Sequence, residues 1–220
     1  MTAGPRSPDR DCGLCPRLQQ YRTANREAHP DWHNAPVPSF GGLDARLLVV
    51  GLAPGVRGAN RTGRPFTGDF AGELLYQTLP RFDLASGVYG ARPDDGLSPR
   101  CCRITNAVRC VPPGNLPTSA EVNSCNPFLV AEMAAMPKLK AVLALGVVAH
   151  KAVLRARRLK ASTAEFRHGA IHELPDGLML ADSYHVSRLN TNTGRLTEAM
   201  FHAVVADIVV RMGDGSADEH

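Results

Sequence analysis

Short, continuous runs of apolar residues constrain the fold of this chain more than any other feature. They occupy residues 46–51, 140–146 and 177–185, and each has the length and composition of a strand buried on both faces. Segments of helical periodicity follow them or lie between them, at residues 71–80, 147–156 and 195–212. Strands that alternate with helices in this way predict an α/β sandwich built on a largely parallel sheet.

Two further segments extend this prediction. Residues 102–108 alternate in polarity as a strand does, and residues 118–121 (TSAE) form a capping box that predicts a helix as far as about Met136. The length of 220 residues suits a single domain, 1–220. Before the first strand, the proline-containing stretch within residues 1–40 reads as an arm that wraps around this domain.

The composition is that of a soluble globular protein with a mild positive charge. Hydrophobic residues make up 44% of the chain, and the formal net charge is +4. This charge is compatible with nucleic acid but does not identify it, since a basic patch matters more than a net sum. No apolar stretch approaches the roughly 20 residues of a membrane span, and the N-terminus lacks the apolar core of a signal peptide. We therefore expect a cytoplasmic monomer with no membrane partner.

Residues with useful chemistry follow the predicted strands. A glycine-rich loop, 51–69 (GLAPGVRGANRTGRPFTGD), leaves the first strand, and Asn106 lies near the end of the second. Gly146 closes the third strand, and His185 follows the fourth. Ligands of open α/β sheets bind at the carboxyl ends of the strands, so we expect these residues to converge on one pocket.

The glycine-rich loop does not have the pattern of a phosphate-binding loop. It lacks the Gly-Lys-Ser/Thr ending of a P-loop and the GxGxxG fingerprint, and the chain has no GxSxG motif. The loop ends in a carboxylate, Asp69, which would repel a phosphate but suits a cationic transition state or a water that needs positioning. Phe66 offers an aromatic face for stacking. The loop therefore suits a flat, uncharged ligand such as a base.

Six cysteines in such a chain are more typical of free thiols or metal ligands than of disulfides. Only Cys12 and Cys15, in CGLC, have the short spacing with which one turn presents two thiolates to a metal. Cys110 and Cys125 can join them only through the fold. Spacing alone favours tetrahedral zinc over an iron–sulfur cluster, and it leaves open that the four are unrelated thiols.

Taken together, these segments resemble the family 5 (type B) uracil-DNA glycosylases, in the iron–sulfur branch of the uracil-DNA glycosylase superfamily. The resemblance runs from Cys12 to about Thr197. It is carried by the CxxC, the loop 51–69, RITNAVRCVPPGN, Cys125, LALG and YHVSRLNTNTGRLT. It implies a three-layer α/β/α sandwich with a central, largely parallel sheet, and an enzyme that initiates base excision repair.

The resemblance also implies a cofactor, a [4Fe–4S] cluster with a structural role that ties down the arm 1–40. The ligands that match the family pattern are Cys12, Cys15, Cys110 and Cys125. Cys101 and Cys102 fall outside the pattern and are expected to be free or core thiols.

The implied catalytic residues follow from the same motifs. Phe66 is expected to stack on a flipped base, and the side-chain amide of Asn106 to read its edge. Asp69 is expected to orient water or stabilise the sugar cation, although it also stands where a helix N-cap would precede FAGELL. His185 is expected to donate a hydrogen bond to the departing base.

Other residues complete the implied site. Gly51 and Ala53 belong to the loop that approaches the base, and Asn190 is expected to be a second polar contact near it. His168 has weaker support, and His150, on a predicted helix, is interpreted as structural.

The segment 186–195 is expected to meet the DNA duplex. Leu189 would wedge into the gap left by the flipped nucleotide, while Arg188 and Arg195 contact phosphates. The chain has HVS at 185–187 where related members more usually have HPS, so a rigid proline is missing from this loop.

The resemblance implies a monofunctional glycosylase that removes uracil from DNA, and with it hypoxanthine, ethenocytosine and hydroxymethyluracil. One alternative is a uracil-restricted family 4 enzyme, which carries an acidic residue where this chain has Leu52. A second is a non-catalytic iron–sulfur or zinc protein that binds DNA or a nucleotide.

Overall fold

A five-stranded sheet forms the centre of the molecule. The computed structural model describes residues 4–214, so the ends of the predicted domain, 1–3 and 215–220, lie outside the described residues. In their order across the sheet the strands are β4 (Cys102–Asn106), β1 (Leu47–Gly51), β5 (Ala141–Leu145), β7 (Met179–Ser183) and β6 (Ile171–Glu173). The first four are parallel, and β6 runs antiparallel to β7 at the edge. The prediction of a largely parallel sheet is confirmed.

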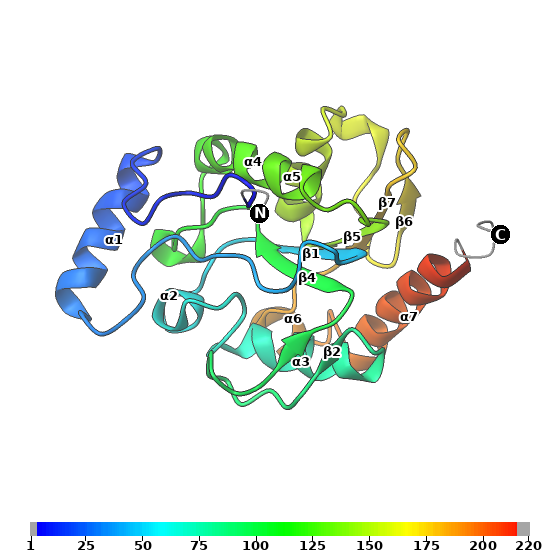
Figure 1. Cartoon of the computed structure of the whole chain (residues 1–220), viewed down its shortest axis with the longest axis horizontal. Helices are drawn as coiled ribbons and strands as arrows, with labels where there is room; N and C mark the ends of the chain where they lie inside the picture. The colour runs from blue at the N-terminus through cyan, green and yellow to red at the C-terminus, as the bar shows by residue number, and fades with distance from the viewer. Residues whose placement is uncertain (1–3, 215–220) are drawn as a thin grey trace.

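Helices cover both faces of the sheet, which confirms the predicted three-layer sandwich (Figure 1). On one face lie α4 (Ser119–Ala134) and α5 (Val147–Ala156), and on the other α3 (Phe70–Arg81), α6 (Arg188–Asn192) and α7 (Glu198–Asp214). A separate cluster of buried apolar side chains fills each interface between helices and sheet. Within residues 4–214, no helix has both the length and the apolar character needed to cross a membrane.

The apolar runs form strands because they are buried on both faces. Every residue of β1 and β5 is buried, and Val49 pairs in register with Ile104 and Leu143. Full burial of each such side chain contributes about 1.5–3 kcal/mol. The same register sets Gly51 opposite Asn106 at the carboxyl ends of β1 and β4, where the candidate site begins.

The predicted capping box at the start of α4 is also confirmed. The Thr118 hydroxyl accepts a hydrogen bond from the Glu121 amide, and the Glu121 carboxylate accepts one from the Thr118 amide. Arg17 also donates to both carboxylate oxygens of Glu121, at 2.7 and 2.8 Å. The start of α4 is thereby tied to the N-terminal part of the chain.

One long helix has no counterpart in the sequence prediction. α1 (Pro16–Ala28) buries only Leu18, Arg22 and Asn25, so its buried face is largely polar and lacks apolar periodicity. A prediction based on apolar spacing cannot detect such a helix.

The other unpredicted elements are short. Between α3 and β4 the chain forms a small hairpin from β2 (Ala85–Ser86) and β3 (Ser98–Pro99), and between α5 and β7 it adds the edge strand β6. A one-turn helix, α2 (Ala59–Thr62), interrupts the glycine-rich loop. Strands of two or three residues have no detectable alternation, so the sequence gives no signal for them.

The segment between α1 and β1 wraps around the outer edge of the sheet. Phe40 forms an antiparallel bridge with Ile104 of β4. Nearer to α1, the backbone amide of Asn34 donates to the backbone carbonyl of Asn60 in α2. The Asn60 side-chain Nδ2 in turn donates to Asn34 Oδ1 at 2.9 Å. The arm therefore braces the glycine-rich loop as well as the sheet.

Candidate functional site

A cavity of about 870 Å³ opens at the carboxyl ends of the strands. The glycine-rich loop, the end of β4, η1 (Pro113–Asn115) with the residue after it, and the segment that follows β7 all contribute to its walls. Residues that line it include Ala53, Phe66, Asp69, Asn106, His185, Arg188 and Leu189. The structure thus brings most of the sequence-predicted residues together, as expected at the carboxyl ends of parallel strands, whereas Gly146 does not line the cavity.

Gly51 lies behind the cavity, between two of the predicted base contacts. A Cβ atom at this position would be 2.3 Å from Phe66 Cζ and 2.4 Å from Asn106 Oδ1. Both side chains therefore rest against the Gly51 backbone, and only glycine leaves room for them. Gly51 acts by allowing this close approach and does not itself line the cavity.

Asn106 presents a free side-chain amide to the cavity. The residue is 3% exposed, and within residues 4–214 its side chain makes no hydrogen bond to another protein group. The backbone around it is fixed, since the next amide, from Ala107, donates to the carbonyl of Gly51 at 2.9 Å. A rigidly held amide with one donor face and one acceptor is suited to read the edge of a pyrimidine.

Phe66 has a left-handed backbone, with φ +53°. This conformation is uncommon outside glycine and asparagine and needs support from the surroundings. The ring is 6% exposed, and its centroid lies 6.3 Å from that of His185, with the two planes inclined by 32°. The aromatic face and the imidazole thus belong to the same wall of the cavity.

Asp69 has a carboxylate enclosed by the glycine-rich loop. A Cβ atom on Gly58 would lie 2.2 Å from its Oδ2, and one on Gly55 would lie 2.8 Å away. The other oxygen, Oδ1, is inaccessible to solvent and has no hydrogen-bond partner among the described residues. Burial raises the pKa of this carboxyl, against an opposing effect of the Gly72 and Ala71 amides. An unsatisfied buried acceptor beside a cavity is the feature expected of a group that engages a reactant.

Asp69 also occupies the N-cap position of α3, as the alternative interpretation required. The Ala71 and Gly72 amides face the carboxylate and lower its pKa, but neither meets the geometry of a capping hydrogen bond. A side chain that only capped the helix would accept a bond from the second or third amide of the first turn. The position is that of a cap, and the carboxylate is left available to the cavity.

His185 is enclosed by the cavity wall, and this burial lowers its pKa to about 4. The imidazole is therefore neutral at physiological pH and donates from one nitrogen only. Asn190 does not line the cavity. Its Nδ2 donates to the His185 carbonyl at 2.8 Å, so Asn190 braces His185, and the structure does not place it against a base.

We expect the neutral state of His185 to be directly observable. The pKa of about 4 predicts that its ring-proton chemical shifts stay constant from pH 8 to pH 5 and change only in more acidic solution. Two-dimensional NMR of the imidazole resonances, assigned with a His185→Gln variant, measures this. A titration midpoint near the ordinary histidine value of about 6.5 would contradict the enclosure seen here.

The rim of the cavity carries two of the predicted DNA contacts. Leu189 is 72% exposed at the rim, and the Arg188 guanidinium lies 5.3 Å from the centroid of the Phe70 ring. Arg195 is not part of the lining and stacks over Tyr184, 4.5 Å from the ring centroid. Sequence reasoning missed Leu116, a second exposed leucine at the rim, because nothing marks a single leucine after a turn.

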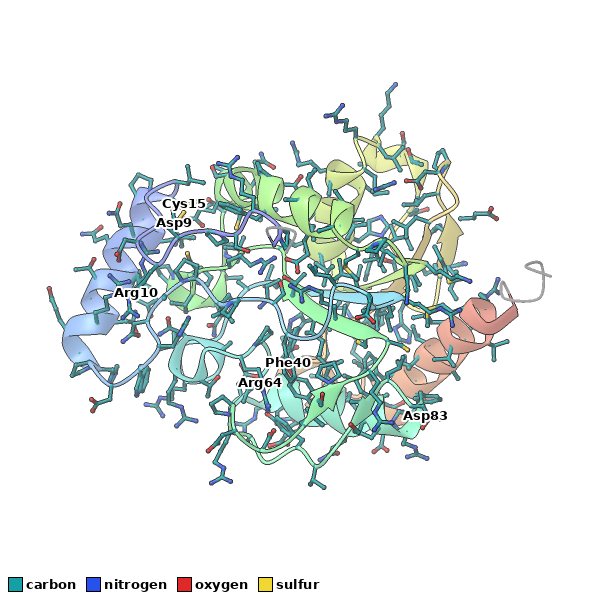
Figure 2. The ribbon with its side chains drawn as sticks, viewed as in Figure 1. Asp9, Arg10, Cys15, Phe40, Arg64 and Asp83 are labelled. Carbon is teal, nitrogen blue, oxygen red and sulfur yellow. The ribbon has the colours of Figure 1, made fainter. Side chains whose placement is uncertain are left out.

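The four cysteines of the predicted cluster line one small cavity between α1 and α4. The segment with Cys12 and Cys15 approaches from one side, and Cys110 and Cys125 from the other; Figure 2 labels Cys15 beside α1. Burial raises the pKa of Cys110 to about 12 and that of Cys125 to about 11. These thiols are therefore protonated unless a metal takes the place of the proton.

Four cysteines that line one cavity supply the all-thiolate donor set that a [4Fe–4S] cluster needs. Within residues 4–214, no three cysteine, histidine or acidic side chains are grouped closely enough to hold a single metal. A [4Fe–4S] cluster binds each thiolate to a different iron, so its ligands surround a larger space. Two donors already point at sulfur: Arg22 Nη1 lies 3.4 Å from Cys110 Sγ, and the Arg109 amide lies 3.4 Å from Cys125 Sγ. The residues present fit the cluster.

Among residues 4–214, the other two cysteines and the histidines apart from His185 line neither cavity. Cys101 is exposed and Cys102 is buried in the core. His150 is buried, with Nδ1 2.8 Å from Asp182 Oδ1 and Nε2 3.0 Å from the Ala164 carbonyl. Both ring nitrogens of His150 are thus used within the fold, as its structural interpretation predicted.

Comparisons with known proteins identify the family of this chain. The model of the uracil DNA glycosylase superfamily matches residues 38–209. A type-5 uracil-DNA glycosylase of Thermus thermophilus is 45% identical over 202 residues, which cover 89% of this chain and 91% of the relative. A type-5 enzyme of Pyrobaculum aerophilum is 44% identical over 191 residues, covering 85% and 83%.

A type-4 uracil-DNA glycosylase of Pyrobaculum aerophilum is more distant. It is 34% identical over 146 residues, which cover 66% of this chain and 60% of the relative. Similarity to the type-5 proteins is thus both higher and more extensive. The chain belongs to the uracil-DNA glycosylase superfamily, and within it to the type-5 family.

Proposed function

We propose that this protein is a monofunctional DNA glycosylase that flips uracil out of DNA and hydrolyses its N-glycosidic bond. One observation supports this most strongly: a single cavity combines an aromatic face (Phe66), a free amide (Asn106), an unsatisfied carboxylate (Asp69) and a neutral imidazole (His185). These are the groups needed to hold a planar base and to break its bond to the sugar.

Asp69 and His185 have different roles in the proposed reaction. As the bond from C1′ to the base nitrogen breaks, its electron pair leaves with the base, and the sugar becomes cationic. The Asp69 carboxylate stabilises that cation and accepts a proton from the water whose oxygen bonds to C1′. His185 donates a hydrogen bond to the developing negative charge on the base, and solvent supplies the proton that the base finally takes up.

The lining of the cavity supports a water nucleophile. Glycosylases that also cut the strand need an amine that forms a Schiff base with the sugar. No lysine lines the cavity within residues 4–214. Hydrolysis to an abasic site, without strand cleavage, is the expected outcome.

The base specificity extends beyond uracil in this proposal. The cavity lies toward the upper end of the size range of small-ligand pockets, and of the two asparagines predicted as base contacts only Asn106 lines it among the described residues. Hypoxanthine, ethenocytosine and hydroxymethyluracil are the further bases we propose. Lesions whose pairing is already weak are favoured, because flipping them costs less.

Abasic-site formation on a labelled duplex with one uracil tests the proposed activity. We expect strand breaks only after alkaline treatment, and none with a matched thymine duplex. Breaks without alkali would show a lyase activity that the cavity does not support. Tight binding to the duplex with no abasic product, for any of the four bases, would favour the non-catalytic binding module.

The DNA interface follows from the rim of the cavity. Leu189 is the wedge that replaces the flipped nucleotide in the stack, and Arg188 neutralises a nearby phosphate. Arg195, held over Tyr184, lies farther from the base and reaches only the flanking backbone.

We also propose that Cys12, Cys15, Cys110 and Cys125 hold a [4Fe–4S] cluster. When bound, the cluster supplies a covalent link between the N-terminal arm and the segment 110–125, with no part in hydrolysis. The buried Arg22 places positive charge beside the thiolates, and its Nη2 also donates to the Cys12 carbonyl at 2.8 Å.

A Cys125→Ser variant tests this cofactor assignment. Wild-type protein purified without oxygen should be brown, with four iron atoms and no zinc per chain. The variant should be pale and lose most of its iron, because one of four ligands is gone. Cys101→Ser, at an exposed cysteine outside the cavity, is the matched control and should keep its colour. Colourless wild-type protein with one zinc would reject the cluster.

A further inference from the structure

A segment with no role in the proposed chemistry contacts the part of the glycine-rich loop that carries Phe66 and Asp69, on the side away from the base cavity. This segment is the hairpin that contains β2 and β3, residues 85–99, here called the hairpin segment. It lies between α3 and β4, on the same side of the sheet as α3 (Figure 1). None of its residues lines the base cavity among the residues described.

The first contact is made by Tyr89. Its hydroxyl accepts a hydrogen bond from the Gly68 amide at 3.2 Å and donates one to the Phe66 carbonyl at 3.3 Å. Phe66 and Gly68 both have positive φ angles, +53° and +85°. One hydroxyl therefore bridges two residues with left-handed backbone, of which Phe66, as a non-glycine residue, carries the strain.

The second contact is a buried ion pair between Arg64 and Asp95. The guanidinium donates to both carboxylate oxygens, at 2.8 and 2.6 Å, and its Nε donates to the Thr67 hydroxyl at 2.7 Å. Asp95 also accepts hydrogen bonds from the Gly90 and Leu97 amides of its own segment, at 2.9 and 3.0 Å. The ion pair thus joins the hairpin segment to the glycine-rich loop.

Aromatic side chains enclose this ion pair. The Arg64 guanidinium carbon lies 5.0 Å from the centroid of Phe40, which Figure 2 shows beside it, and 5.4 Å from that of Tyr76. The Tyr76 hydroxyl in turn donates to the Pro65 carbonyl at 2.5 Å. Arg64 is 5% exposed, so the pair is screened little by water.

Helix α3 closes the arrangement from the other side. A Cβ atom on Gly72 would lie 1.7 Å from the Phe66 carbonyl oxygen and 2.5 Å from the Tyr89 hydroxyl. The backbone of the helix thus packs directly against the bridged atoms. The Phe66 carbonyl, the Thr67 hydroxyl and the Gly68 amide thus each have a hydrogen-bond partner outside the segment 66–68.

We propose that Tyr89, Arg64 and Asp95 are positioning residues, which set the Phe66 ring and the Asp69 carboxylate in the arrangement that the base requires. This inference rests on the proposed glycosylase function. The three residues touch neither base nor sugar. They stabilise the left-handed backbone conformation at Phe66. Without them the loop would relax into a conformation in which the Phe66 ring and the Asp69 carboxylate no longer face the same ligand.

Tyr89→Phe is the sharpest test, because it removes one oxygen and keeps the ring. The amide of Gly68 loses its acceptor, so hydrogen exchange in the segment 64–72 should accelerate about tenfold while β1 and β5 keep wild-type rates. The single-turnover rate of uracil release should also fall about tenfold. The acid limb of the pH–rate profile should shift to lower pH, because a loosened loop hydrates Asp69.

Tyr21→Phe, whose hydroxyl bonds to no described residue, is the matched control. It should change neither the exchange rates, nor the rate of uracil release, nor the pH–rate profile.

The outcomes separate this inference from the proposed function. Faster exchange with a slower rate and a shifted acid limb supports it. Faster exchange with an unchanged rate rejects the positioning role, and unchanged exchange rejects the contact itself. If wild-type protein releases no base, the proposed function fails, while faster exchange in the variant still establishes that the hairpin segment holds the loop. Asp95→Asn removes the charge of the ion pair and keeps the size of the side chain. It should reproduce the effects of Tyr89→Phe.

Discussion

Replacing Asp69 with asparagine should lower the rate of uracil release by about 10²–10⁴-fold, the range expected when a positioned proton acceptor is removed. The amide keeps the shape of the carboxylate but neither takes the proton from water nor stabilises the sugar cation. Single-turnover kinetics on a uracil duplex measure the loss. Asp31→Asn, at an exposed aspartate, should leave the rate unchanged. A rate within tenfold of wild type would remove Asp69 from the mechanism.

The same variant should be more stable than wild type at neutral pH. Burial raises the pKa of Asp69 in the folded protein, so the folded state holds its proton more tightly than the unfolded chain does. The free energy of unfolding therefore falls as pH rises from the ordinary aspartate value through the raised pKa, and above both values the ionised carboxylate is a net cost. Thermal unfolding of wild type and variant at pH 7 and pH 4 should show a difference that narrows in acid.

Gly51→Ala should lower the rate of base release about 10²-fold by displacing one of the predicted base contacts. The new methyl group would overlap Phe66 Cζ and Asn106 Oδ1, so at least one of the two base contacts must move. A displacement of about 1 Å at a catalytic site costs about 10²-fold in rate, and overpacking costs about 1–3 kcal/mol of stability. Steady-state kinetics and thermal unfolding measure both effects. Gly213→Ala adds the same methyl group in open space and is the control.

A kinetic result would reveal which contact yields in the Gly51→Ala variant. If the Phe66 ring moves, KM should rise for every base, because stacking is independent of base identity. If the Asn106 amide moves, the loss should depend on the hydrogen-bonding edge of the base. Wild-type kinetics for Gly51→Ala would mean that the close approach of these side chains is not required.

The sequence predicted the central sheet well because its strands are apolar on both faces. The runs 46–51 and 140–146 correspond to β1 and β5 within one residue, and the helix after β5 begins and ends where its periodicity does. The convergence of Asn106, Asp69 and His185 also followed from strand order alone. In a parallel sheet the carboxyl ends share one edge, so residues far apart in sequence meet there.

Three of the features that the sequence did not predict depend on polar contacts. α1 buries Arg22 toward the cysteines, and no apolar pattern marks a helix with a buried arginine. Asn190 was expected to contact the base because it is polar and near the motif, yet its amide is used by the His185 carbonyl. The partner of Arg64 is Asp95, 31 residues away, and a single sequence contains no signal for such a pairing.

Neither edge of the sheet is both long and unpaired, and this bears on how one molecule can meet another. At the β4 edge, the bridge between Phe40 and Ile104 uses hydrogen-bonding groups that would otherwise be free to pair with another molecule. At the opposite edge, β6 has three residues and ends in the exposed Glu173. Short, charged or covered edges are the means by which sheets avoid joining one another. Within residues 4–214 the sheet therefore offers no long, unpaired edge along which the sheet of another molecule could add.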